Sequence, residues 1–225
     1  MQAACLVVAA VLAFRLRPSV PAGEERAGVF RSTWEGMCYV AGNRRMLIIV
    51  AAALLPSFLV YPYVTFLPVF ARDILGSDQT GYGYLASAVG LGSLAGGTLV
   101  AITSGANRQG LRMAWTLMLY SASVGAFALS RDLWLSVAIL AVAGIFHSIY
   151  SALNGALMQL QADTAYRGRV MALQSMTWGV TPFAALVMGA MIDRWGAPEV
   201  VFGWLVVAVL SSLPIALFSK EMRRV

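Results

Sequence analysis

The chain is short of charge, histidine and cysteine. Only 12% of its 225 residues are charged, 60% are hydrophobic, and there are one histidine and two cysteines. Soluble domains are close to half apolar and about a quarter charged, so this composition excludes an ordinary soluble fold. The single histidine, His147, has no cluster of ligand-type residues beside it, so we predict neither a metal ion nor any other cofactor.

Sequence motifs for enzymatic chemistry are also missing. A phosphate-binding Gly-x-x-x-x-Gly-Lys segment is absent, so an ATP-driven pump would need a separate motor chain. The alternative of an intramembrane serine protease would rest on Ser93, but the segment around it lacks the glycine two positions before the serine. We therefore predict that the protein is not an enzyme.

Long charge-free stretches account for most of the chain. A membrane-spanning helix needs roughly 20 mostly apolar residues, and six stretches reach about that length. The backbone must be helical there because hydrocarbon cannot bond its polar groups. The sequence thus predicts an all-α, polytopic membrane protein with a six-helix bundle over residues 46–219. The stretches are 46–71, 79–107, 113–130, 133–162, 170–192 and 200–219.

Two segments precede this bundle and a short tail comes after it. Residues 1–14 contain an apolar run too short to span, which we interpret as the remnant of a truncated transmembrane helix, with a short interfacial anchor as the alternative. Residues 15–45 predict a cytoplasmic linker that ends in an amphipathic helix, and residues 220–225 a cytoplasmic tail. The stripe of that helix is Phe30, Trp34, Met37 and Ala41.

Basic residues predict the orientation. If the six stretches span, thirteen of the sixteen Lys and Arg residues fall on one side of the membrane. Such an excess on short loops marks the cytoplasmic side, which places the C-terminus in the cytoplasm. The three on the other side are Arg72, Arg131 and Arg194. The net charge of +6 is thereby explained by topology, and we predict no nucleic-acid partner. Cys38 falls on the cytoplasmic side and Cys5 in the short first run, so we predict no disulfide.

A faint internal repeat divides the stretches three plus three. The segment 107–110 (Asn-Arg-Gln-Gly) recurs 86 positions later as 193–196 (Asp-Arg-Trp-Gly), and the same shift lays Tyr61 on His147 and Thr65 on Ser151. Three spans separate the two copies, so they lie on opposite sides of the membrane. This pattern predicts an inverted repeat, an arrangement typical of secondary transporters.

Several stretches carry a family resemblance over nearly the whole chain. They are Phe66-Leu67-Pro68-Val69-Phe70-Ala71 with Gly81-Tyr82-Gly83, the glycine-rich segment 90–97, Tyr166-Arg167-Gly168-Arg169-Val170-Met171, and the segment 189–198. With these, the chain resembles the C-terminal half of a major facilitator superfamily transporter, closest to the bacterial branch of enterobactin-exporter-like proteins and transmembrane secretion effectors.

The resemblance implies a function and partners. It implies helices seven to twelve of a twelve-helix carrier in a bacterial inner membrane, exporting a small-molecule substrate by alternating access. A lone half would need an N-terminal half or a second copy of itself as partner, besides the lipid bilayer. The alternative is a non-transporting six-helix scaffold or a degraded gene product.

The resemblance also points to cytoplasmic loop residues. The segment with Asn107, Arg108, Gly110 and Arg112 resembles the second copy of the superfamily signature Asp-Arg-x-Gly-Arg-Arg, with Asn107 in place of the acid and Leu111 in place of a basic residue. Arg167 and Arg169 precede the fifth stretch, and the resemblance implies that they pair with acids such as Asp163 when the inner gate closes.

Polar residues at helical spacing predict the lining of a substrate cavity. They share faces of the first, fourth and fifth stretches, where polar groups in hydrocarbon should point inward. The candidates are Tyr61, Thr65, His147, Ser151, Asn154, Gln174 and Trp178. The alternative is that such groups only bond neighbouring helices. The third and sixth stretches have less organised polarity, as the resemblance implies for lipid-facing helices.

Glycines and acidic residues add two expectations. We expect Gly92, Gly96, Gly144 and Gly189 to let helices pack closely. No Asp or Glu lies inside any of the six stretches, so proton coupling would use His147 or carboxylates outside this chain.

Overall fold

Helices make up all the regular structure that the computed structural model describes, which covers residues 29–102 and 109–218. This confirms the all-α prediction for those residues. The helices are α2 (Val29–Gly42), α3 (Arg44–Leu59), α4 (Tyr63–Val69), the π-helix η1 (Phe70–Ile74), α5 (Gln79–Ile102), α6 (Gln109–Leu129), α7 (Leu133–Gln161), α8 (Arg167–Trp178), α9 (Thr181–Trp195) and α10 (Ala197–Phe218). The chain divides after Ser32, and the residues from Thr33 onward form one compact unit.

Some predictions lie outside the described residues. They concern the remnant helix 1–14, most of the linker before α2, the loop residues Asn107 and Arg108, and the tail 220–225.

The apolar helices identify a multi-pass membrane protein. Among the described residues, four helical segments are long and apolar enough to cross a bilayer, and a shorter apolar helix covers Ala197–Ser212. The four segments are Arg44–Ile74, Gln79–Ile102, Leu133–Gln161 and Arg167–Trp195. α6 coincides with the third charge-free stretch but is not one of the four. The count of six spans therefore stays a prediction.

Polar side chains cap the helices where the chain enters its apolar segments. The Asn43 side chain accepts hydrogen bonds from the backbone N–H groups of Arg45 and Met46, and Asp132 accepts one from Leu135. Before α5, Asp78 accepts from the N–H groups of Thr80 and Gly81, and these bonds lower the pKa of its carboxyl. Each cap satisfies N–H groups that a helix leaves without an internal partner.

The first span, Arg44–Ile74, is interrupted near its middle. The Tyr61 N–H donates to the Pro56 carbonyl instead of to Ser57, at 2.7 Å, and Pro62 has no N–H to offer the Phe58 carbonyl. α3 therefore ends at Leu59, and the chain makes one turn before α4 begins. The break leaves backbone carbonyls of the first span in need of new partners.

The helical segment Arg167–Trp195 is also interrupted, next to the first break. Gly179 and Val180 form short bonds to carbonyls three residues back, and Pro182 comes next, in the first turn of α9. The Thr181 hydroxyl donates to the Ser57 carbonyl at 3.1 Å. One side chain thus satisfies a carbonyl that the break in the first span has released, and the two breaks are joined.

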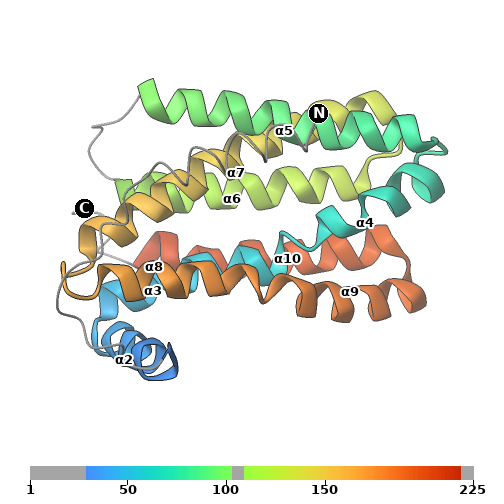
Figure 1. Ribbon diagram of the computed structural model, residues 1–225. Helices are drawn as coiled ribbons and strands as arrows, with labels where there is room; N and C mark the ends of the chain where they lie inside the picture. Colours follow the sequence, from blue (N-terminus) through green and yellow to red (C-terminus); the bar gives the residue numbers. More distant parts are fainter. Residues whose placement is uncertain (1–28, 103–108, 219–225) are drawn as a thin grey trace, which may run out of the picture. The chain divides into compact units, whose positions relative to one another are not determined.

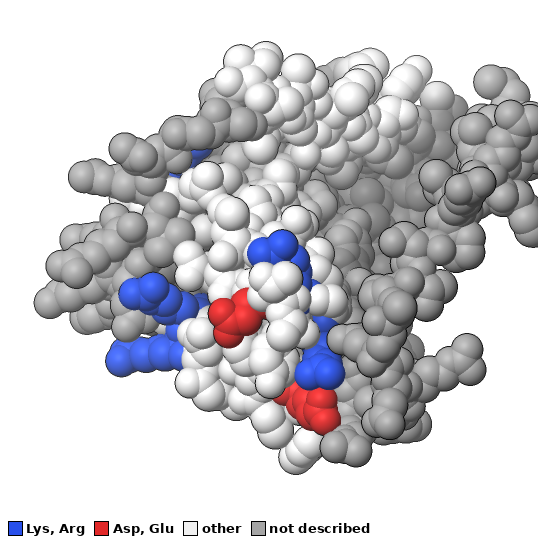
Figure 2. Space-filling view, turned by 60° about the vertical axis from the view of Figure 1, so that its left-hand side comes forward, with Lys and Arg blue, Asp and Glu red and all other residues white. Residues whose placement is uncertain are grey.

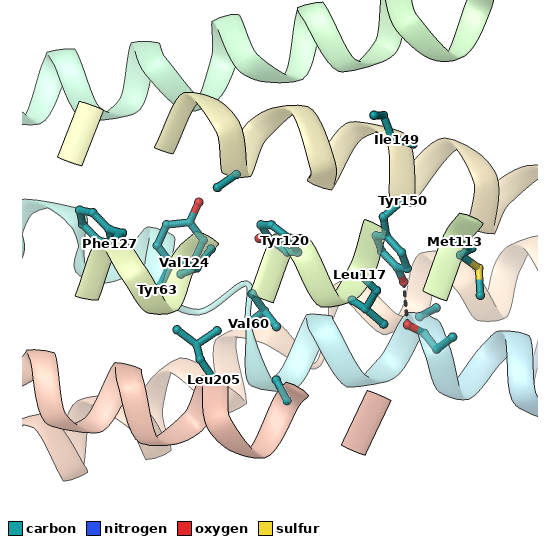
Figure 3. Close-up of a cluster of buried hydrophobic side chains, with 14 of the residues drawn as sticks. Val60, Tyr63, Met113, Leu117, Tyr120, Val124, Phe127, Ile149, Tyr150 and Leu205 are labelled. Atoms are coloured by element: carbon teal, nitrogen blue, oxygen red, sulfur yellow. Dashed lines mark hydrogen bonds between the residues drawn. The ribbon is translucent and has the colours of Figure 1, made fainter. Parts of the chain in front are cut away.

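α7 contacts several of the other helices. It packs along α5 and α6 and also contacts α3, whereas α10 packs on α6, α3 and α9 (Figure 1). Where α4, α6 and α10 meet, Tyr63, Val124, Phe127 and Leu205 form part of a buried apolar cluster (Figure 3). The Phe127 ring lies 4.8 Å from that of Phe70, centroid to centroid. α6 is thereby anchored between α7 and α10.

Glycines bring α5 and α7 into backbone contact. A Cβ atom at Gly92 would overlap the Ala141 carbonyl, and one at Gly144 would overlap the Val89 carbonyl. Gly96 meets Ile145 in the same way. Gly189 differs, because a Cβ there would make ordinary contact with the Phe66 ring. Three of the four glycines chosen from the sequence therefore lie where two helix backbones cross.

We predict that Gly92→Ala destabilises the protein whereas Gly90→Ala does not. The added methyl group at Gly92 forces α5 and α7 apart, and overpacking of this kind costs about 1–3 kcal/mol. Nothing lies within 4 Å of a Cβ at Gly90, which makes it the matched control. Thermal unfolding of the purified protein in detergent measures both. Equal unfolding temperatures for the two variants would show that the crossing is not close.

Candidate functional site

Three helix faces and one residue of α6 line a partly open cavity of about 40 Å³. Six of the seven residues predicted to line a substrate cavity lie around it: Tyr61, His147, Ser151, Asn154, Gln174 and Trp178. They come from the first span, α7 and α8, which are far apart in the sequence. The remaining lining residues are Ala53, Pro56, Ser57, Tyr120, Tyr150 and Thr177.

Asn154 links the helices around the cavity. It is buried, and its side-chain N–H group donates to the Ile49 carbonyl of α3 at 3.2 Å and to the Met113 sulfur of α6 at 3.6 Å. The oxygen of the same amide accepts a hydrogen bond from the Gln174 side chain of α8 at 3.4 Å. A single side chain of α7 thus contacts α3, α6 and α8.

Tyr150 makes a second bond between α7 and α3. Its hydroxyl donates to the Ala52 carbonyl at 2.7 Å, and the ring is buried (Figure 3). Bonds between spans in hydrocarbon are worth about 1 kcal/mol each. For Tyr150 and Asn154, bonding between helices is therefore a role that the structure shows directly.

Aromatic rings form one wall. The Tyr61 ring lies 5.4 Å from the His147 ring and 5.3 Å from the Trp178 ring, the latter edge to face. The Tyr120 ring lies 5.1 Å from the His147 ring. These centroid distances fall in the range preferred for aromatic pairs. The wall is rigid and amphipathic, because each ring carries a polar atom.

Three polar groups at the cavity are not committed to the protein. Within the described residues, no hydrogen bond is made by the Tyr61 hydroxyl, the His147 imidazole or the Ser151 hydroxyl. Polar groups at membrane depth need partners, so these three can hold water or polar atoms of a ligand. The cavity has room for water, since one molecule needs about 10–15 Å³ of such volume. None of the residues that line the cavity is Asp, Glu, Lys or Arg.

Thr65 lies outside this cavity. The sequence predicted that it shares a face with Tyr61, but the break at residues 60–62 interrupts the helix between them. Thr65 instead lines an open, mainly apolar groove of about 830 Å³ together with Phe66, Thr181 and Gly189. Tyr61 and Trp178 belong to both the cavity and the groove.

Sequence reasoning missed Tyr120. It lies on α6, the third stretch, which was expected to face lipid, yet its side chain is buried and lines the cavity. The buried face of α6 includes Met113, Leu117, Tyr120 and Val124 at helical spacing (Figure 3). A search for apolar and aromatic periodicity, rather than for polar residues alone, would have found this face.

The loop before α8 is tied to α2. Arg169 pairs with Glu35 at 3.1 Å, and Asp163 accepts a hydrogen bond from the Tyr39 hydroxyl, also at 3.1 Å. Arg169 thus pairs with an acid of α2, and the expected pairing of these arginines with acids such as Asp163 when the inner gate closes stays a prediction. Arg167 is exposed. At the start of α6, Gly110 is buried and Arg112 half-buried.

We predict that Tyr150→Phe lowers the free energy of unfolding by about 1 kcal/mol, because the Ala52 carbonyl loses its donor while the ring remains. Tyr84→Phe is the control, since Tyr84 is exposed and its hydroxyl bonds to no described residue. Chemical unfolding in mixed micelles compares the two. A loss in Tyr150→Phe no greater than in Tyr84→Phe would contradict the role given to this bond.

No three His, Cys, Asp or Glu side chains gather into a metal site within 29–102 and 109–218. In comparisons with known proteins, the family profile described as Major Facilitator Superfamily matches residues 1–185, most of the chain. No curated protein and no solved structure gave a match. Members of this family are transporters rather than enzymes, which fits an apolar helical bundle with an uncommitted polar cavity. The chain belongs to the Major Facilitator Superfamily of membrane transporters.

Proposed function

We propose that the chain is the C-terminal half of a small-molecule exporter that works by alternating access. One observation carries this proposal: polar side chains from separate spans converge on a single cavity beside two joined helix breaks. Substrate sites of secondary carriers lie near the middle of the membrane, between two bundles and next to discontinuous helices. The partner bundle is an N-terminal half or a second copy of this chain.

The uncommitted groups favour a substrate role over a purely structural one. Asn154 and Tyr150 are used in bonds between helices, but Tyr61, His147 and Ser151 are not. Groups that serve only to join helices would be bonded to a neighbouring helix. A small molecule with an aromatic ring and hydrogen-bonding groups suits the rings and hydroxyls of this lining.

The neighbour relations of the helices support six spans in an inverted repeat. Exchanging the first span with α7, α5 with the α8–α9 span, and α6 with α10 turns most observed packing pairs into observed pairs. The α9–α10 pair is the exception, because its counterpart α5–α6 is not among the packing pairs of the described residues. The α6–α7 pair becomes α10–α3, and the α6–α10 pair becomes itself. Tyr61 and His147, which the repeat relates, also contact each other.

The proposed orientation places the end that carries α2 and the start of α8 in the cytoplasm of a bacterial inner membrane. The excess of basic residues on this side supports it. The loop residues Asn107, Arg108, Gly110, Arg112, Arg167 and Arg169 then lie on the cytoplasmic side, where a gate between two bundles would close. The direction of transport rests on the resemblance to the exporter branch.

A reactivity test separates a wet cavity from a lipid-facing surface. In a chain without Cys5 and Cys38, we expect Ser151→Cys to react with a charged, membrane-impermeant thiol reagent, because thiols react as thiolates in water. Val142→Cys on the same helix is the control, since Val142 is 43% exposed on the outer surface of the bundle. Modification of Val142→Cys but not of Ser151→Cys would overturn the assignment of the cavity.

Transport itself is tested with a panel of antibiotics and fluorescent dyes. Expression of the native gene in a bacterium lacking its own exporters should lower the accumulation of at least some compounds. Gln174→Leu should weaken that effect roughly tenfold, the cost of leaving polar groups unpaired. Ser175→Ala is the control, because Ser175 is exposed and bonds only within its own helix. Unchanged accumulation of every compound would favour the scaffold alternative.

A further inference from the structure

We propose that α2 and the start of α3 form a docking surface for the anionic headgroups of a phospholipid leaflet. In this proposal Trp34, Met37 and Ala41 lie among the headgroups, while Arg44 and Arg45 contact lipid phosphates. The inference rests on the placement of α3 as a membrane span and is independent of transport.

One face of α2 is fixed to the protein. Glu35 pairs with Arg169 at 3.1 Å, and the Tyr39 ring stacks on Tyr166 with centroids 4.4 Å apart and planes within 5°. The Tyr39 hydroxyl both donates to the Asp163 carboxylate and accepts from the Asp163 backbone N–H. A Cβ at Gly36 would already lie 3.2 Å from that of Arg169. These contacts fix which face of α2 is turned toward the rest of the protein.

The opposite face of α2 is apolar and uncovered. Trp34 is 65% exposed and Met37 42% exposed, and Cys38 and Ala41 are exposed beside them. These four positions fall on one side of the helix by the 3.6-residue period. An exposed apolar stripe that includes a tryptophan is typical of helices that lie in the headgroup region of a bilayer.

Arginines lie where this face meets the membrane. Asn43 caps α3, so Arg44 and Arg45 occupy its first turn, directly before the buried Met46. Both arginine side chains are exposed. Because α3 enters the bilayer from this point, the two guanidinium groups lie at headgroup depth, where Arg binds phosphate oxygens well.

The local charge favours anionic lipid. The described charged residues at this end are Glu35, Arg44, Arg45, Arg112, Asp163, Arg167 and Arg169, which is five arginines against two acids. Glu35 is paired with Arg169 and Asp163 is held by the Tyr39 hydroxyl, and the arginines outnumber the two acids, so the balance of charge at this end stays positive. In Figure 2, which turns this end forward, basic side chains and smaller acidic areas lie on an otherwise uncharged surface.

The charge rule for membrane topology does not by itself explain this arrangement of α2. Arginines near the cytoplasmic side would satisfy the charge rule with α2 in any rotation, and with its apolar face against protein. In this protein the contacts of α2 with α8 and the uncovered apolar face of α2 are on opposite sides of the helix. Arg44 and Arg45 follow closely after α2 in the chain. That combination singles out a lipid leaflet as the occupant.

Cys38 offers a probe on the proposed surface. In the full chain carrying Cys5→Ser, an environment-sensitive fluorophore on Cys38 is compared in nanodiscs of phosphatidylcholine alone and with added phosphatidylglycerol. We expect a blue-shifted, brighter emission with phosphatidylglycerol, and loss of this difference in Arg44→Gln/Arg45→Gln. Arg131→Gln, an exposed arginine at the other end, should keep it. Identical emission in both nanodiscs, or a difference that survives Arg44→Gln/Arg45→Gln, would overturn the proposal.

A second measurement avoids both the label and Cys5→Ser. Native mass spectrometry of the otherwise unaltered chain counts the phosphatidylglycerol molecules retained after extraction. Each arginine removed should weaken retention roughly fivefold, the value expected for one basic residue near an anionic surface. Equal retention by the parent chain and Arg44→Gln/Arg45→Gln would contradict the proposal, whatever the outcome of the transport panel.

Discussion

Hydrocarbon offers no hydrogen-bond partner, and this one constraint shapes both the bundle and its site. Along most of the chain the helix satisfies its own backbone. At Pro62 and Pro182 it cannot, because proline has no N–H to give. The Ser57 carbonyl, released near the first of these, is bonded by Thr181 beside the second. The cavity lies next to this repaired defect, so the place where helical bonding fails is also the place where polar groups are free to meet a ligand.

The close crossing of α5 and α7 holds α7, which lines that site, in place. With Gly92, Gly96 and Gly144 in backbone contact, α7 is held against α5, and its other face turns Asn154 and Tyr150 toward α3. Asn154 also contacts α6 and α8. These bonds, and two of the three groups that make no hydrogen bond within the described residues, His147 and Ser151, therefore come from the same few turns of α7.

Much of this arrangement could be predicted from charge and periodicity, and the failures have physical causes. Gaps between charged residues locate the apolar helices closely, because charges are expelled from hydrocarbon, and polar stripes identify half of the cavity lining. Thr65 lies with Tyr61 in the groove but not in the cavity, because the helix is interrupted at residues 60–62. Tyr120 was missed because the search followed strongly polar residues. The partner of Arg169 proved to be Glu35, a contact between distant segments that spacing cannot reveal.

The central claim is that this bundle works against a second one, and the most direct test is the mass of the protein as it occurs in its native membrane. With a tag on the C-terminus of the native gene, a denaturing gel gives the size of the polypeptide and native mass spectrometry that of the intact complex. The account predicts either a polypeptide roughly twice the 24.0 kDa of this chain or a complex in which the chain is joined to a second helical bundle. A solitary 24.0 kDa chain with no protein partner would contradict it.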